Sequence, residues 1–129
     1  MKLIIATGIL SFLFSNPSDI ANKAEGWEGK HYKKGVSAQC AAFVGRVVKD
    51  SGKTPPAGHY KCTNWLRWGK PVNRDNLKRG DIIIYSKSGK YHHISIYIGN
   101  GYAMHRPTMS KTVRKIKYNY RSIIAIRRG

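Results

Sequence analysis

The sequence predicts an α+β domain in which N-terminal helices pack on a small antiparallel β-sheet. Helical periodicity is confined to the first half of the chain, apolar strand-like runs fill the second half, and the two types do not alternate as in β-α-β units. The chain has 129 residues, room for one domain, and 41% of them are hydrophobic, enough for a core. We therefore expect one folded domain over residues 18–129.

Three helices are expected in the first half, where helical periodicity and terminating glycines place them at residues 18–26, 40–51 and, more briefly, 60–68. The strongest is 40–51, because its apolar residues recur on one face and Gly52 follows as a stop. Those apolar residues are Cys40, Phe43, Val44, Val47 and Val48. Two prolines and a glycine predict a turn over 53–58.

The second half predicts the strands of the sheet, at residues 82–85, 93–98, 102–105, 112–118 and 123–127. A hairpin loop is expected over 86–90. The Gly99–Gly101 segment predicts a tight turn with positive φ, which would pair strand 93–98 with strand 102–105.

Residues 1–17 form a separate hydrophobic segment in which Lys2 precedes about 12 uncharged residues. This pattern is typical of a short signal peptide, and it is too short for a membrane-spanning helix of ~20 residues. No small-x-small cleavage triplet follows Phe14, so a retained core helix or anchor is the alternative. We expect a secreted or periplasmic protein without a stable transmembrane span.

The chain is strongly basic, with 24 Lys and Arg against 6 Asp and Glu and a net charge of +18. Such a charge predicts an anionic partner: a nucleic acid, an acidic membrane or a cell-wall polymer. Residues 106–129 contain no acid and include Tyr118 and Tyr120, a basic and aromatic pattern found in nucleic-acid-binding surfaces. No recognised nucleic-acid motif accompanies it, so nucleic acid is the less favoured partner.

Cys40 and Cys62 are the two cysteines, and their spacing fits no zinc framework, so we expect no metal and no cofactor. Cys40 lies in the first turn of the strongest helix, where the helix dipole favours a thiolate nucleophile, although a small buried residue is the alternative. A Cys40–Cys62 disulfide is allowed by number but would silence a catalytic thiol. We interpret Cys62, with Trp65 and Trp68, as packed in the core, with Cys62 a free thiol.

Two histidines supply the groups that a thiol nucleophile needs. The expected hairpin brings His93, at the start of one strand, near His105, at the end of the next. A cysteine, a base and a polar group that orients the base are the arrangement required for acyl transfer. His92 is the alternative base, but it faces the opposite side of its strand, and we favour His93 from its register.

Four segments together resemble the NlpC/P60 and CHAP families of cell-wall cysteine peptidases. They are Ala38–Val44 around Cys40, Thr63–Pro71 with its Trp-Leu-x-Trp-Gly run, Leu77–Tyr85 and His93–Gly101. The resemblance extends from residue 19 to residue 128, and it implies a papain-like fold with the cysteine on a helix and the histidine on the sheet.

The resemblance also implies residue roles: Cys40 as nucleophile, His93 as base, His105 as the group that orients His93, and Tyr32 of the Tyr-x-x-Gly segment near the oxyanion. The chain departs from both families. It has Gln-Cys-Ala-Ala over residues 39–42 where NlpC/P60 members have Asp-Cys-Ser-Gly, and a histidine where CHAP members often have Asn, Asp or Glu. The bond that is cut therefore stays open.

The function expected from these features is hydrolysis of an amide bond in the peptide part of peptidoglycan, by an endopeptidase or an amidase, in a monomer of bacterial or phage origin. The basic charge then attracts peptidoglycan or another anionic wall polymer. A non-catalytic basic wall-binding module of the same fold is the first alternative, and a nucleic-acid-binding protein is the second.

Overall fold

The computed structural model describes residues 17–35, 38–87, 91–107 and 110–129. The signal-like segment expected over residues 1–17 lies outside the described residues up to residue 16, and so does 88–90 of the expected hairpin loop. Among the residues that are described, no helix combines the length and apolarity needed to cross a bilayer.

The described elements follow the expected order, helices first and strands after. The helices are α2 (Pro17–Glu25), α3 (Gln39–Asp50) and the short 3-10 helices η1 (Cys62–Arg67), η2 (Arg74–Asn76) and η3 (Tyr120–Ser122). The strands are β1 (Lys70–Pro71), β2 (Ile82–Lys87), β3 (Tyr91–Gly99), β4 (Tyr102–His105), β5 (Arg114–Lys117) and β6 (Ile123–Arg128). An α+β domain with a small sheet is therefore confirmed.

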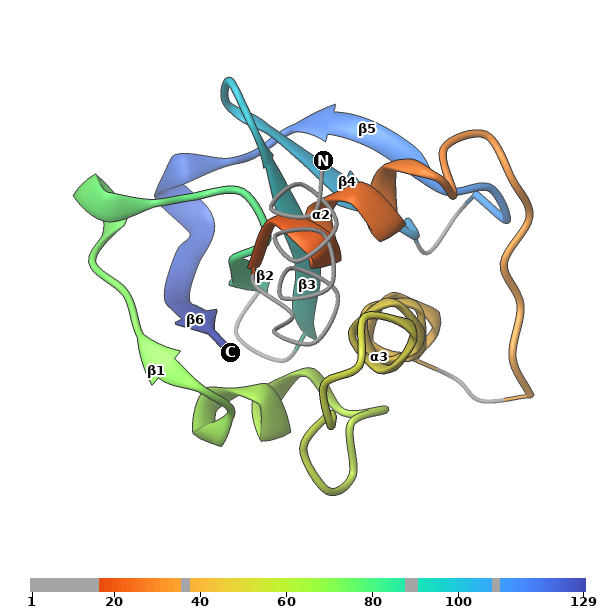
Figure 1. Ribbon diagram of the computed structural model, residues 1–129, viewed down its shortest axis with the longest axis horizontal. Coiled ribbons are helices and arrows are strands. Elements are labelled where there is room, and N and C mark those ends of the chain that lie inside the picture. The colour runs from red at the N-terminus through yellow and green to blue at the C-terminus, as the bar shows by residue number, and fades with distance from the viewer. Residues whose placement is uncertain (1–16, 36–37, 88–90, 108–109) are drawn as a thin grey trace, which may run out of the picture.

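The six strands form one sheet in the order β1-β6-β2-β3-β4-β5, and every described pairing between them is antiparallel. Consecutive hairpins build β2 to β5, because short turns favour antiparallel neighbours. The C-terminal strand β6 then returns to the other edge of β2 and carries β1 beside it (Figure 1). This topology places the β2–β3–β4 hairpins at the centre of the sheet.

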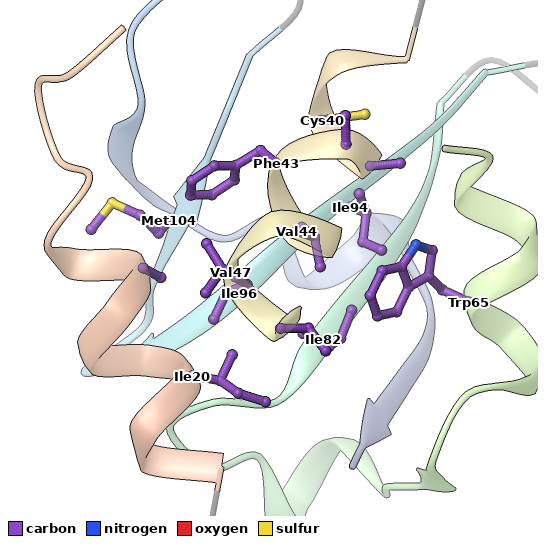
Figure 2. Close-up of a cluster of buried hydrophobic side chains, with 14 of the residues drawn as sticks. Ile20, Cys40, Phe43, Val44, Val47, Trp65, Ile82, Ile94, Ile96 and Met104 are labelled. Atoms are coloured by element: carbon purple, nitrogen blue, oxygen red, sulfur yellow. The ribbon is translucent and has the colours of Figure 1, made fainter. Parts of the chain in front are cut away.

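The core lies between this sheet and the two helices α2 and α3. Helix α3 buries the apolar face expected from the sequence, and its side chains meet Ile82, Ile94 and Ile96 of the sheet (Figure 2). Helix α2 adds Ile20 to the same cluster. The core therefore holds the first turn of α3 at a fixed position against β3, which is what positions the site described below.

Several sequence expectations need correction. The α-helix expected over residues 60–68 is wrong: the segment forms the shorter 3-10 helix η1. Glycines with positive φ, Gly58 and Gly69, lie on either side, and the N–H of Trp68 bonds the carbonyl of Trp65, three residues back, which is the 3-10 pattern. The strand β1 was not expected, because its two residues pair with the distant Arg127 and Arg128.

The bounds of other strands also differ, with β3 covering Tyr91–Gly99 rather than 93–98 and β6 ending at residue 128 rather than 127. Strand β2 extends to Lys87, beyond the expected end at residue 85, and pairs along its whole length with β3. Strand β5 covers residues 114–117 rather than 112–118. Residue 112 instead makes an isolated bridge with His31, so the segment before β5 is tied to the loop that leads to α3.

A buried ion pair fixes β6 beside β2. Asp81 is fully buried at the start of β2, and its carboxylate accepts hydrogen bonds of 2.7 Å from both Nε and Nη2 of Arg128 on β6. The backbone N–H of Lys78 donates to the same carboxylate at 2.8 Å. A buried carboxylate needs such partners to offset the loss of hydration. The pair therefore holds β6 against β2, the strand next to β3, which carries His93.

Candidate active site

Cys40 is the second residue of α3, and its side chain lies at the N-terminal end of the helix (Figure 2). The first turn of an α-helix leaves N–H groups without intrahelical partners and carries the positive end of the helix dipole, so it favours an anionic sulfur. No side chain caps this helix at Ala38. Cys40 is 9% exposed, so it lies at the edge of the core.

Gln39 fixes the loop before Cys40. Its amide Nε2 donates to the carbonyl of Lys34, and its Oε1 accepts a 2.8 Å hydrogen bond from the N–H of the same residue. The side chain thus clamps the backbone of the preceding loop from the first residue of α3. This two-way hydrogen bond gives a structural reason for an amide at the position where the NlpC/P60 motif has an acid.

His93 and His105 meet across the β3–β4 hairpin, as the sequence led us to expect. Continuing the register that pairs Ile96 with Met104 puts His105 one pleat away from His93 on the same face of the sheet. Nε2 of His93 and Nδ1 of His105 lie 2.6 Å apart, and both residues are buried. The two rings are nearly parallel, with centroids 4.8 Å apart, so His105 fixes the orientation of His93.

Tyr85 forms one wall of this histidine pair. It lies directly opposite His93 in the β2–β3 register, and its ring stacks on both imidazoles at centroid distances of 5.7 and 5.9 Å. Its hydroxyl and the Ser95 hydroxyl are 2.8 Å apart. The sequence pattern did not single out Tyr85 or Ser95 as site residues, although both follow from counting cross-strand partners along the hairpin.

Cys62 lies beside Cys40 and was not expected at the site. We call Cys40, Cys62, His93 and His105 the thiol cluster. Sγ of Cys62 lies 3.7 Å from Sγ of Cys40, and both cysteines are buried and free, as the sequence led us to expect for Cys62. The Cys62 thiol also approaches the backbone carbonyl of His92 at 3.6 Å. The contact between His92 and the site therefore runs through its backbone, and His93 is the one of these two histidines whose ring belongs to the thiol cluster.

The surroundings of Cys40 stabilise its thiolate and lower its pKa to about 4. The largest cause is a hydrogen bond from the Cys62 thiol, followed by interaction with the His93 imidazole and the N–H of Ala41; burial opposes them. The pKa of Cys62 is raised in turn, because its proton is held by Cys40 and the site is desolvated. The cluster thus contains one thiolate and one thiol, which are the states required of a nucleophile and a donor.

Comparison with known proteins places this arrangement in a family. A model described as the NlpC/P60 family matches residues 26–126, which is most of the chain. The chain belongs to the NlpC/P60 family. This confirms NlpC/P60, the first of the two families that the sequence resembles.

Relatives of known activity are similar to this NlpC/P60 chain at moderate identity. A murein DD-endopeptidase/murein LD-carboxypeptidase, MepS, of Escherichia coli K12 is 31% identical over 101 residues, covering 74% of this chain and 52% of the relative. A γ-D-glutamyl-L-lysine dipeptidyl-peptidase of Bacillus cereus is 29% identical over 96 residues, covering 72% and 27%. The chain therefore spans about half, or less, of the length of these relatives.

Solved structures of NlpC/P60 proteins share the fold. A family member from Bacillus cereus superposes with a TM-score of 0.72 at 25% identity, covering 87% of this chain and 39% of the other. NlpC2 of Trichomonas vaginalis gives 0.72 at 23% identity, covering 89% and 47%. The NlpC/P60 fold expected from the sequence is thus confirmed.

Tyr32 of this NlpC/P60 chain lies under the first turn of α3. Its hydroxyl donates a 3.0 Å hydrogen bond to the carbonyl of Ala42, two residues after Cys40, and burial raises its pKa, so it stays protonated. Nε of Arg106 donates to the Tyr32 carbonyl at 2.8 Å. Arg106 follows His105 directly in the chain and is buried, so it ties the end of β4 to the Tyr32 segment.

A second feature of the surface is a cationic groove on the outer side of α3, a hollow of about 140 Å³. Its lining residues are Tyr32, Lys33, Lys34, Ala42, Gly45, Arg46, Lys49, His59 and Tyr60. At 100° per residue, the helix positions among them lie opposite the face that carries Cys40. The groove is therefore separate from the thiol cluster.

The electrostatics of this groove are dominated by lysines. Burial and then the charges of Lys49 and Lys34 lower the pKa of His59, which keeps that ring neutral. Arg46 is paired with Asp50 at 2.8 Å, so part of its charge is compensated. Within the described ranges, no three His, Cys, Asp or Glu side chains gather in a set that could hold a metal ion.

Proposed function

We propose that this chain is a cysteine peptidase that hydrolyses an amide bond in the peptide part of peptidoglycan. The observation that carries the proposal is the buried His93–His105 pair, with its 2.6 Å contact, beside a thiol at a helix N-terminus whose environment favours the thiolate. The names of the two relatives, a murein endopeptidase and a γ-D-glutamyl-L-lysine peptidase, support a peptide bond of the wall as the substrate.

The reaction begins with the thiolate of Cys40 attacking the amide carbonyl. Because Nε2 of His93 is engaged with His105, Nδ1 is the ring nitrogen that exchanges the proton with Cys40 and the leaving amine. Protonated at Nδ1, His93 donates that proton as the amine departs and the thioester forms. It then takes a proton from the water that hydrolyses the thioester, which regenerates Cys40.

The oxyanion needs hydrogen-bond donors on the carbonyl side of this attack. The N–H groups in the first turn of α3 supply them, because they point out of the helix at the position where the negative charge develops. We also propose Tyr32 as a donor, since its hydroxyl stays protonated and bonds the carbonyl of Ala42, two residues after Cys40. This role requires its proton to leave the carbonyl of Ala42 and turn to the substrate.

His105 orients the base without adding a negative charge. A neutral imidazole accepts the His93 Nε2–H through Nδ1, which sets the tautomer and holds the ring in plane. A carboxylate in this place would stabilise an imidazolium more strongly. The hydrogen bond from Cys62 offsets this difference, because it stabilises the partner ion, the thiolate, directly.

The decisive test is digestion of purified peptidoglycan, followed by mass spectrometry of the released muropeptides. The proposal predicts new peptide termini that appear with the untreated protein and vanish after alkylation of its thiols. Release of intact stem peptides from the glycan would instead assign an amidase. Binding to the wall without any new termini would leave the non-catalytic module of the same fold.

The cationic groove supports an anionic wall polymer as a second contact of the protein. Lys34 and Lys49 present positive charge to one hollow on the side of α3 opposite the nucleophile, so a polyanion could occupy it while a peptide occupies the thiol site. We infer that the protein acts outside the cytoplasm, where such polymers and the proposed substrate occur. Attraction of this kind weakens as salt rises.

A charge reversal tests this contact. Lys49→Glu in the groove should weaken binding to purified cell walls and reduce its salt dependence more than Lys23→Glu, which makes the same charge change on the exposed face of α2. Sedimentation with walls at increasing salt measures both. Equal losses in the two variants would mean that only net charge matters, and tighter retention on DNA than on walls would favour the nucleic-acid alternative.

A further inference from the structure

We propose that Cys40 and Cys62 form an oxidation site, at which a hydroperoxide converts Cys40 to a sulfenic acid and Cys62 closes a reversible Cys40–Cys62 disulfide. The disulfide removes the nucleophile, so the site would switch the enzyme off under oxidising conditions and protect it from permanent damage. The loss of activity rests on the proposed function, whereas the formation of the disulfide does not.

The geometry of the two sulfur atoms carries the proposal. They lie 3.7 Å apart, and a disulfide requires about 2.0 Å, so they must approach by about 1.7 Å. Cys40 is the second residue of α3 and Cys62 is the first residue of η1, so both belong to the ends of their elements. Side chains at such ends can rotate toward each other with less disturbance to the helix interior.

The chemistry balances with one molecule of peroxide. The Cys40 thiolate attacks one oxygen of hydrogen peroxide, the O–O bond breaks, hydroxide leaves, and Cys40 becomes a sulfenic acid. The Cys62 sulfur then attacks the Cys40 sulfur, the S–O bond breaks, and the thiol proton leaves with the hydroxyl group as water. Overall, two sulfur atoms are oxidised to a disulfide and one peroxide is reduced.

The environment separates the roles of the two cysteines. The low pKa of Cys40 keeps it as the thiolate that reacts with peroxide, whereas the pKa of Cys62 is raised mainly by its hydrogen bond to Cys40. Oxidation of Cys40 to a neutral sulfenic acid removes that constraint, so Cys62 becomes a better nucleophile after the first step. Cys62 then has its target within van der Waals distance.

A resolving thiol at this distance also limits damage. A sulfenic acid without a neighbouring thiol is oxidised further to sulfinic acid, which is irreversible in most proteins. The contact with Cys62 offers a faster, intramolecular path to a disulfide that thiol reductants reverse. Disulfides persist in extracytoplasmic compartments, where we place this protein, so the oxidised state would be stable there.

The test uses the full chain and hydrogen peroxide as the probe. After treatment, the wild type should lose two hydrogen atoms by intact mass, lose both alkylatable thiols, and yield a peptide cross-linked between Cys40 and Cys62. Peptidoglycan digestion should fall by about tenfold or more and return to within about twofold after dithiothreitol. Peroxide-treated protein that keeps two alkylatable thiols, or loses activity without the cross-link, would overturn the proposal.

Cys62→Ser is the matched variant, with its activity referred to its own untreated sample and its fold checked by thermal melting. Its Cys40 should be trapped by dimedone as a sulfenic acid, and a larger part of its lost activity should resist dithiothreitol. Recovery equal to that of the wild type would overturn the protective role. If the variant does not fold, the presence or absence of the cross-link in the wild type alone decides whether the oxidation site exists. A cross-link in a protein that digests no peptidoglycan would refute the proposed function and leave the oxidation site standing.

Discussion

Cys62 should control the acidity of Cys40, the proposed nucleophile, and its removal is the most informative perturbation of the site. The structure makes the Cys62 hydrogen bond the largest contribution to the low pKa of Cys40, which is about 4. A hydrogen bond to a charged group contributes about 1.5–3 kcal/mol, and one pKa unit corresponds to about 1.4 kcal/mol. Cys62→Ala should therefore raise the pKa of Cys40 by about one to two units.

The rate of alkylation by iodoacetamide as a function of pH measures this pKa, because only the thiolate reacts. At pH 5 the wild type, with a pKa of about 4, is about 90% thiolate, whereas the variant should be about 10–50% thiolate. At pH 7 both should be largely ionised, so the difference appears on the acidic side of the profile. The raised pKa of Cys62 keeps it out of the wild-type reaction in this range.

Cys62→Ser is the control for this experiment, because its hydroxyl keeps a hydrogen-bond donor in the same place. Its Cys40 pKa should lie between those of the wild type and Cys62→Ala. A Cys40 pKa that is unchanged in Cys62→Ala, or lower, would refute the reasoning that the second thiol donates to the nucleophile. The same profile recorded for peptidoglycan digestion would show whether the acidic limb of activity follows the thiolate.

Three further outcomes follow from the hydrogen bonds and packing around the site. His105→Ala should lower kcat by about 10²-fold with little change in KM, because His93 loses its orienting partner and the substrate contacts remain; initial-rate kinetics check this. Arg128→Ala should cost about 2–3 kcal/mol in urea unfolding, because Asp81 stays buried without its cation, whereas Arg46→Ala, which breaks an exposed pair, should cost about 0.5 kcal/mol or less. Gly69→Ala should cost about 2–4 kcal/mol by the same measurement, since its φ is +59° and a methyl group would collide with the Arg128 carbonyl.

The parts of the site that the sequence predicted are those set by local rules. The helix of Cys40 follows from five apolar residues at helical spacing, and His93 faces His105 because a tight Gly-Asn-Gly turn joins two strands of alternating pattern. Each of these depends on residues less than about 15 positions apart. The alternation of side chains along a strand also predicted that His92 and His93 lie on opposite faces of β3.

The parts that the sequence did not predict depend on contacts between distant segments. Cys62 reaches Cys40 from a separate segment 22 positions away in the chain, and no periodicity encodes that contact. The pairing of β6 with β2 likewise includes an ion pair between Arg128 and Asp81, which are 47 positions apart in the chain. Residues 60–68 carry a helical pattern, yet the N–H of Trp68 bonds the carbonyl of Trp65, three residues back, and the segment is a 3-10 helix.

The Cys40 sulfur is the proposed nucleophile of a peptidoglycan peptidase, and the direct test of that role is the initial rate of muropeptide release by Cys40→Ala. We expect a loss of about 10³-fold or more in rate, with an unchanged thermal melt and with wall binding retained. A Cys40→Ala protein that releases the same muropeptides at the wild-type rate would contradict it.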